Sequence, residues 1–169
     1  HILDNQDNEL AVGEVGAIYF ETDSTFSYHG DEDKTRDSYS RQGWSTLGDV
    51  GYVDEEGYLY LTDRRSNMII SGGVNIYPQE AENVLINHPS VFDVAVIGVP
   101  HPEFGESVKA VVQLYTGIDP SNDRAAELIE YCQQYLTKYK CPRSVDFVAE
   151  LPRLPSGKLL KRELLTQYR

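Results

Sequence analysis

Two apolar runs separated by a short polar loop constrain the fold of this chain more than any other feature. Residues 91–99 read VFDVAVIGV and residues 107–115 read SVKAVVQLY, and both are rich in the β-branched residues that favour strands. The first run is apolar at nearly every position, which is typical of a strand buried on both faces. The turn-rich segment 100–105 between the two runs is predicted to be a loop.

Helical patterns flank these strands. A helix is predicted from Pro78, because proline suits the first position of a helix. A long helix is predicted over residues 123–138 and a closing helix over residues 161–168, with a third strand over residues 145–149. The second half is therefore expected to be a small α/β domain, with a three-stranded sheet and flanking helices. The expected apolar face of the long helix consists of Ala125, Leu128, Ile129, Cys132, Tyr135, Leu136 and Tyr139.

The first part of the chain is β-rich instead. Strands are predicted over residues 14–20, 50–53 and 58–61, and the last two are joined by an Asp-Glu-Glu-Gly turn. Residues 22–42 are polar without apolar periodicity, which predicts a long exposed loop. This part is too small and too rich in loops to bury much surface alone. Because the chain also lacks an initial methionine, we expect it to be a piece of a longer protein that packs on upstream chain.

Charge and composition exclude several classes of function. With 27 acidic and 15 basic residues, the net charge of −12 argues against nucleic acid as the main partner. No apolar run approaches the length of a transmembrane segment, and a reducing cytoplasm is the simplest location. Cys132 and Cys141 fit neither a disulfide framework nor a metal site, so no metal ligands are assigned. The four histidines, at positions 1, 29, 88 and 101, lack a paired nucleophile and are assigned no catalytic role.

A lysine near the C-terminus is the main candidate for catalysis. Residues 151–164 (LPRLPSGKLLKREL) place Lys158 after a Pro-Ser-Gly turn, where a long cationic side chain can reach a phosphate or a carboxylate. A phosphate-loop motif is excluded, because Pro152 stands where that motif needs glycine and Leu159 where it needs serine or threonine. Taken alone, the segment also fits a flexible surface lysine.

Three further features have both a structural and a functional interpretation. Asp49 follows Gly48 at a tight turn and either caps that turn or accepts hydrogen bonds from the two hydroxyls of a ribose. The glycine pair of residues 71–73 (Ser-Gly-Gly) follows a strand predicted over residues 68–70, and it is either an ordinary turn or a place where backbone approaches a thin ligand. Lys140, beside Arg143, either decorates a helix C-terminus or attracts the phosphates of an anionic ligand.

Two blocks of sequence together resemble a known family. Residues 43–80 (GWSTLGDVGYVDEEGYLYLTDRRSNMIISGGVNIYPQE) followed by residues 151–164 are similar to the C-terminal signature of the adenylate-forming enzymes: acyl-CoA synthetases, luciferases and peptide-synthetase adenylation domains. The resemblance implies that Asp49 holds the ribose of AMP and that Arg64 also contacts the nucleotide. Ser66 falls at the hinge, where the family most often has aspartate or lysine. Lys158 would bridge the substrate carboxylate and the α-phosphate during acyl-adenylate formation.

The wording of the glycine segment favours the acyl-CoA synthetases within this family. There, Ser71, Gly72 and Gly73 would line the channel for the pantetheine arm of coenzyme A, with Lys140 on the same side. The resemblance implies that residues 1–63 are the tail of a large N-terminal adenylation domain and residues 64–169 a mobile C-terminal lid. ATP, Mg²⁺, coenzyme A and a carboxylic acid would be bound together with that N-terminal domain, and the chain alone would be inactive.

Two alternatives stay open on sequence grounds. An adenylation domain would load its acyl group onto the phosphopantetheine of a carrier protein instead of coenzyme A. A stand-alone binding module derived from the lid would have no catalytic function. The identity of the acid is not encoded in these residues.

Overall fold

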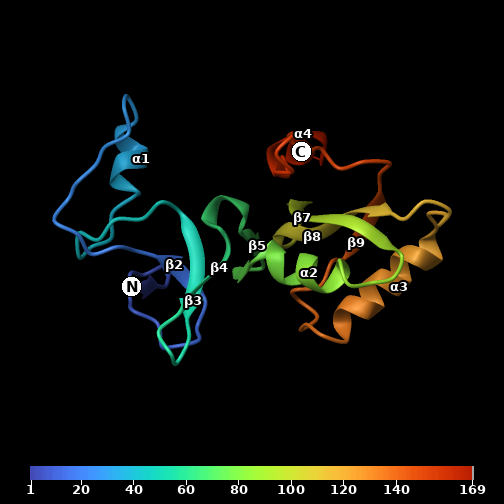
Figure 1. Ribbon diagram of the computed structural model, residues 1–169, viewed down its shortest axis with the longest axis horizontal. Coiled ribbons are helices and arrows are strands. Elements are labelled where there is room, and N and C mark those ends of the chain that lie inside the picture. The colour runs from blue at the N-terminus through green and yellow to red at the C-terminus, as the bar shows by residue number, and fades with distance from the viewer. Residues whose placement is uncertain (169) are drawn as a thin grey trace. The chain divides into compact units, whose positions relative to one another are not determined.

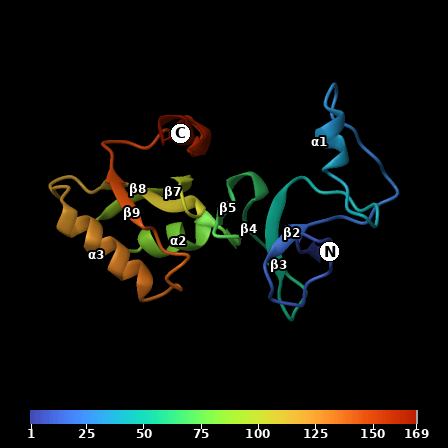
Figure 2. The same cartoon turned by 180° about the vertical axis from the view of Figure 1, so that it is seen from behind.

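The computed structural model describes residues 1–168 and divides into two compact units, His1–Ser66 and the chain from Asn67 onward (Figures 1 and 2). Each unit has its own sheet, and the mixed α/β class predicted from the sequence is confirmed. Of the helices in the described residues, none is long and apolar enough to cross a membrane. The assignment of residues 1–63 and 64–169 to two domains of a larger enzyme stays a prediction.

The first unit is built on a four-stranded sheet with the order β1-β2-β3-β4, in which every neighbouring pair is antiparallel. Leu3, Ile18 and Val50 are buried within it. Tight backbone approach explains Gly51, since a Cβ atom there would lie 2.1 Å from the carbonyl oxygen of Tyr60. The strands are β1 (Ile2–Leu3), β2 (Gly16–Ile18), β3 (Asp49–Val53) and β4 (Leu59–Arg64).

A short helix, α1 (Glu32–Arg36), lies in the segment predicted to be loop throughout, so that prediction is wrong in part. Asp31 caps the helix by accepting a hydrogen bond from the backbone N–H of Lys34 at 2.9 Å. None of its residues is buried. A helix without a buried face leaves no apolar period in the sequence, which is why it was missed.

The second unit contains a five-stranded sheet with the order β6-β5-β8-β7, and β9 pairs in parallel with β8. The predicted three-stranded sheet is therefore too small. Of the two additional strands, β5 overlaps the strand that the sequence predicts over residues 68–70, whereas β6 was not predicted; each is three residues long, too short for an alternating pattern. The predicted loop 100–105 is also shorter, because pairing continues to His101 opposite Gly105. The strands are β5 (Ile69–Ser71), β6 (Val74–Ile76), β7 (Val91–His101), β8 (Gly105–Leu114) and β9 (Ser144–Phe147).

Strand β7 is buried on both faces, as its apolar run predicts. Val94 and Val96 pack in a core with helices α2 (Pro78–Leu85) and α3 (Asn122–Gln133). Ala95 and Ile97 pack in a second core with Leu164 of helix α4 (Lys161–Tyr168). Helices α2 and α3 therefore cover one face of the sheet and α4 the other (Figures 1 and 2).

The helix ends agree with the sequence in two cases and differ in one. Helix α2 begins at Pro78 and α4 spans Lys161–Tyr168, as predicted. Helix α3 ends at Gln133, five residues before the predicted end. Consequently Tyr135 and Tyr139, expected on its buried face, are 62% and 49% exposed. The 3.6-residue period was extended past the point where the backbone leaves the helix.

The two cysteines are expected to resist alkylation in the folded protein. Cys132 and Cys141 are buried, and burial raises the pKa of both thiols, that of Cys132 from 9.0 to about 12. Because the thiolate is the reactive form, iodoacetamide at pH 8 should label neither residue. Both should react after unfolding in guanidinium chloride, as mass spectrometry would measure. Stoichiometric labelling of the native protein would contradict this burial.

Candidate functional site

An ion pair joins the two residues assigned to the nucleotide. Asp49 begins β3 and Arg64 ends β4, and the antiparallel register places them directly opposite each other. The Nε atom of Arg64 lies 3.2 Å from Oδ1 of Asp49. The adjacent turn is held by Thr46, whose hydroxyl accepts a hydrogen bond from the N–H of Gly48 at 3.0 Å. The Asp49 carboxylate thus faces a cation, an arrangement suited to hydroxyl and phosphate ligands.

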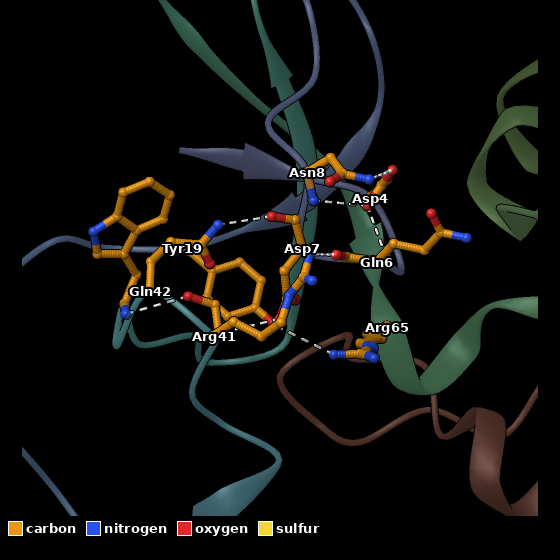
Figure 3. Close-up of polar contacts among 10 residues, drawn as sticks. Asp4, Gln6, Asp7, Asn8, Tyr19, Arg41, Gln42 and Arg65 are labelled. Carbon is orange, nitrogen blue, oxygen red and sulfur yellow. Dashed lines mark hydrogen bonds and ion pairs between the residues drawn. The ribbon is translucent and has the colours of Figure 1, made fainter.

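A polar cavity of about 1040 Å³ lies beside this pair within the first unit. Its walls include Arg64 and Ser66 together with Tyr19 and Arg65, which sequence reasoning did not select. The hydroxyl of Tyr19 accepts a hydrogen bond from Nη1 of Arg65 at 3.5 Å, as Figure 3 shows. Four cations (Lys34, Arg36, Arg64 and Arg65) and three carboxylates (Asp7, Asp31 and Asp37) line the cavity, so a small excess of positive charge favours an anionic ligand.

One residue that lines this cavity, Asp7, lies in a loop near the N-terminus that is hydrogen-bonded to residues 41 and 42 (Figure 3). Asp7 accepts a hydrogen bond from the backbone N–H of Arg41 at 2.9 Å. Its carbonyl oxygen accepts another from the amide of Gln42 at 2.8 Å. On another part of the lining, Lys34 of α1 lies over the ring of Tyr28, 3.9 Å from its centroid. In the sequence, only the polar composition of residues 22–42 indicated that this segment could contribute polar side chains to a binding site.

The glycine pair forms the turn between β5 and β6. Gly72 and Gly73 have φ angles of +58° and +81°, in the left-handed region that glycine adopts readily. The N–H of Gly72 donates to the carbonyl oxygen of Phe104 at 2.9 Å. The space where a Cβ of Gly73 would lie is open to 4 Å, so the backbone there is accessible. Phe104 was missed, and it carries the guanidinium of Arg143 at 4.3 Å from its ring centroid.

Lys140 is engaged in an ion pair with Glu80. Its ammonium group lies 2.9 Å and 2.6 Å from the two carboxylate oxygens, and both side chains are largely buried. A groove of about 630 Å³ nearby is lined by Lys138 and Arg143. Positive charge for an anionic ligand is therefore offered by these two residues more directly than by Lys140, whose assignment to coenzyme A stays a prediction.

Lys158 lies in an exposed turn that closes on itself. The N–H of Leu154 donates to the carbonyl oxygen of Lys158 at 2.9 Å, and the N–H of Gly157 donates to that of Leu154 at 2.8 Å. Arg153 and Leu159 form an isolated bridge at the base of the turn. The Lys158 side chain extends from the turn into solvent, available to an approaching anion.

Metal binding finds no support among the described side chains. Within residues 1–168, no group of three or more His, Cys, Asp or Glu residues is placed to hold a metal ion. Because Mg²⁺ is usually bound by one or two carboxylates together with substrate phosphates, the Mg²⁺ expected from the resemblance stays a prediction. The structure brings Asp49 and Arg64 together in the first unit, and it holds the glycine turn, Lys140 and Lys158 in the second.

Comparisons with known proteins agree with this arrangement. Residues 80–158 match the AMP-binding enzyme C-terminal domain. The chain is 44% identical to the long-chain-fatty-acid–CoA ligase FadD13 of Mycobacterium tuberculosis strain H37Rv over 141 residues, which are 83% of this chain and 27% of that protein. A 2-succinylbenzoate–CoA ligase of Bacillus mycoides is 44% identical over 140 residues, 83% of this chain and 28% of its own.

A solved structure extends the similarity to the fold. ATP-bound MatB from Rhodopseudomonas palustris superimposes with a TM-score of 0.84 at 35% sequence identity, covering 99% of this chain and 33% of that one. The chain thus spans between a quarter and a third of the length of the proteins that it matches.

Proposed function

Because residues 80–158 belong to the AMP-binding enzyme C-terminal domain family, we propose that this chain is the C-terminal part of an ATP-dependent acyl-CoA synthetase. The complete enzyme would convert a carboxylic acid and ATP into acyl-AMP and pyrophosphate. Coenzyme A would then attack the acyl-AMP to give the thioester and AMP. The exposed Lys158 at the tip of its closed turn is the observation that carries the proposal, since it offers a mobile cation on a fixed base.

In the first half-reaction, Asp49 and Arg64 would hold the nucleotide. The Asp49 carboxylate can accept hydrogen bonds from the ribose hydroxyls while its ion pair with Arg64 holds it in place. The ammonium group of Lys158 would stabilise the negative charge shared by the carboxylate and the α-phosphate as the bond between them forms. Mg²⁺ would neutralise part of the charge of the ATP phosphates when bound with them.

In the second half-reaction, the glycine turn would face the thiol substrate. The open space at Gly73 allows the pantetheine arm to pass close to the backbone. Lys138 and Arg143, beside the groove that they line, would attract the phosphates of coenzyme A. Ser66 is the last residue of the first unit, which suits the hinge about which the second unit would turn between the two half-reactions.

The proposal is tested on the full-length protein that contains this chain. We expect AMP release that requires both a carboxylic acid and coenzyme A, measured over a panel that includes long-chain fatty acids and aromatic acids. The 169-residue chain alone should release none, because it spans only about a quarter of the related ligases. Acid-dependent turnover with a holo carrier protein but not with coenzyme A would favour carrier loading. No acid-dependent AMP release with either acceptor would reject the synthetase.

A further inference from the structure

Two ion pairs hold the turn that carries Lys158, one on each side of it. On the N-terminal side, Arg153 pairs with Asp93 of β7. On the C-terminal side, Lys161 of α4 pairs with Glu82 of α2. We refer to these four residues as the clamp. Both carboxylates belong to elements of the second unit that pack in its main core, whereas both cations belong to the segment around Lys158.

The Arg153 pair has the geometry of a strong, oriented contact. Nε and Nη2 of Arg153 donate to the two carboxylate oxygens of Asp93, each at 2.7 Å. Such a two-point fork fixes the plane of the guanidinium as well as its distance. The third nitrogen, Nη1, donates to the carbonyl oxygen of Gly157 at 2.7 Å. One side chain therefore ties the residue immediately before Lys158 to the sheet.

Asp93 is itself held in place. Its side chain is 16% exposed, and Oδ1 also accepts a hydrogen bond from the backbone N–H of Val94 at 2.9 Å. The hydrogen bonds with Asp93 raise the pKa of Arg153, partly offset by burial, and the charges of Asp93 and Glu82 raise it further. The Arg153 guanidinium therefore stays protonated over the whole working range of pH.

The second half of the clamp is more deeply buried. Nζ of Lys161 lies 2.7 Å from Oε1 of Glu82, and these side chains are only 13% and 10% exposed. The same oxygen accepts a hydrogen bond from the N–H of Val96 at 2.7 Å. Removing one member of a buried pair leaves an uncompensated charge, which destabilises the fold strongly. Lys161 and Glu82 thus dock α4, whereas the more exposed Arg153 acts on the turn.

From these contacts we propose that Arg153 and Asp93 are positioning residues for Lys158, fixing its turn so that its ammonium group meets the reacting carboxylate and α-phosphate. This role rests on the synthetase activity proposed above. A misplacement of about 1 Å can cost on the order of 10²-fold in rate, so a lysine on a loosened turn would lose much of its effect without losing its charge. The thioester half-reaction, in which Lys158 takes no part, would not depend on the fork.

The test uses Asp93→Asn and Arg153→Gln in the full-length protein. Asparagine keeps the acceptor for Val94 and the shape of the side chain, but it removes the charge and one arm of the fork. We expect acid-dependent ATP–pyrophosphate exchange to fall about tenfold in kcat, with little change in KM for ATP or acid. Thioester formation from supplied acyl-AMP should stay near the wild-type rate. Arg153→Lys, which keeps the charge without the fork, should give an intermediate loss.

A matched control separates positioning from stability. Asp146 pairs with Lys109 at 2.7 Å between strands β9 and β8, another ion pair of the same sheet. Asp146→Asn removes a carboxylate that makes no contact with the Lys158 turn, so it should leave the ratio of the two half-reactions unchanged. Equal losses in both half-reactions for Asp93→Asn and Arg153→Gln, or wild-type exchange in both variants, would overturn the positioning role.

A second readout distinguishes failure of this inference from failure of the proposed function. The N–H groups of Leu154 and Gly157 close the turn, so their hydrogen exchange reports its rigidity independently of activity. We expect exchange at both amides to be faster in Arg153→Gln than in Asp146→Asn. If the wild-type protein shows no acid-dependent ATP–pyrophosphate exchange, both the synthetase activity and the positioning role are rejected. If the enzyme is active but amide hydrogen exchange in Arg153→Gln is unchanged, only the positioning role of the Arg153–Asp93 pair is rejected.

Discussion

Replacing Lys158 by alanine in the full-length protein is expected to slow acyl-adenylate formation by about 10²–10³-fold, the usual cost of removing one preorganised charge-stabilising donor. Thioester formation from supplied acyl-AMP should stay near the wild-type rate. The loss should appear without a change in Tm, because the Lys158 side chain is exposed and packs in neither core of the second unit. Acid-dependent ATP–pyrophosphate exchange measures the first half-reaction and thioester yield from acyl-AMP the second.

Arg162 supplies the matched control for this experiment. It is an exposed cation four residues further along the chain, on helix α4. Arg162→Ala removes the same charge from the same region and should leave both half-reactions unchanged. If Lys158→Ala keeps wild-type exchange, the lysine is a surface residue and the adenylate step depends on other groups. If Arg162→Ala loses exchange equally, the effect is one of general charge and the assignment to Lys158 fails.

The elements that the sequence predicted well are those whose burial leaves a periodic pattern. Strand β7 is apolar on both faces because two cores flank it, so the nearly continuous apolar run of residues 91–99 predicted its position. Helix α2 was located from Pro78, whose fixed φ angle suits a first turn. Helix α1 has no buried residue, so it leaves no apolar pattern. Strands β5 and β6 each bury one isoleucine, Ile69 and Ile76, but are too short to show an alternating pattern.

Some residues of the candidate site could be predicted from the sequence and others could not. Asp49, Arg64, the glycine turn and Lys158 were selected because they stand in recognisable sequence blocks. The residues that fix the turn of Lys158 were not selected, because they are far apart in the chain: Arg153 and Asp93 are separated by sixty residues. The chain has 27 acidic and 15 basic residues, so sequence alone allows many pairings. Only the tertiary fold decides which carboxylate each cation meets.

Glu82 illustrates this limit. Its place near the start of α2 predicts a carboxylate that complements the helix dipole in solvent. In the structure it is buried, accepts a hydrogen bond from the N–H of Val96 and pairs with Lys161. A buried carboxylate needs partners of this kind, and they come from β7 and α4. Composition and local position gave no sign that this glutamate would connect three elements.

Gly73→Val is expected to slow the thioester half-reaction and spare adenylate formation, the reverse of the effect expected for Lys158→Ala. A branched side chain there would occupy the open space beside the glycine turn, which the pantetheine arm is proposed to use. We expect thioester formation from acyl-AMP to fall by on the order of 10²-fold, because a small displacement of the attacking thiol is enough for such a loss. Acid-dependent ATP–pyrophosphate exchange, which does not need coenzyme A, should be nearly unchanged.

Gly117 makes this prediction specific to the site. Its φ angle of +88° is close to the +81° of Gly73, it is exposed, and no heavy atom lies within 4 Å of its Cβ position. Gly117→Val therefore imposes the same left-handed strain, roughly 1–2 kcal/mol, in a turn with no assigned function. Both variants should lose similar stability, so a selective loss of thioester formation in Gly73→Val alone would come from blocked access. Equal thioester rates in the two variants would mean that coenzyme A does not approach along this turn.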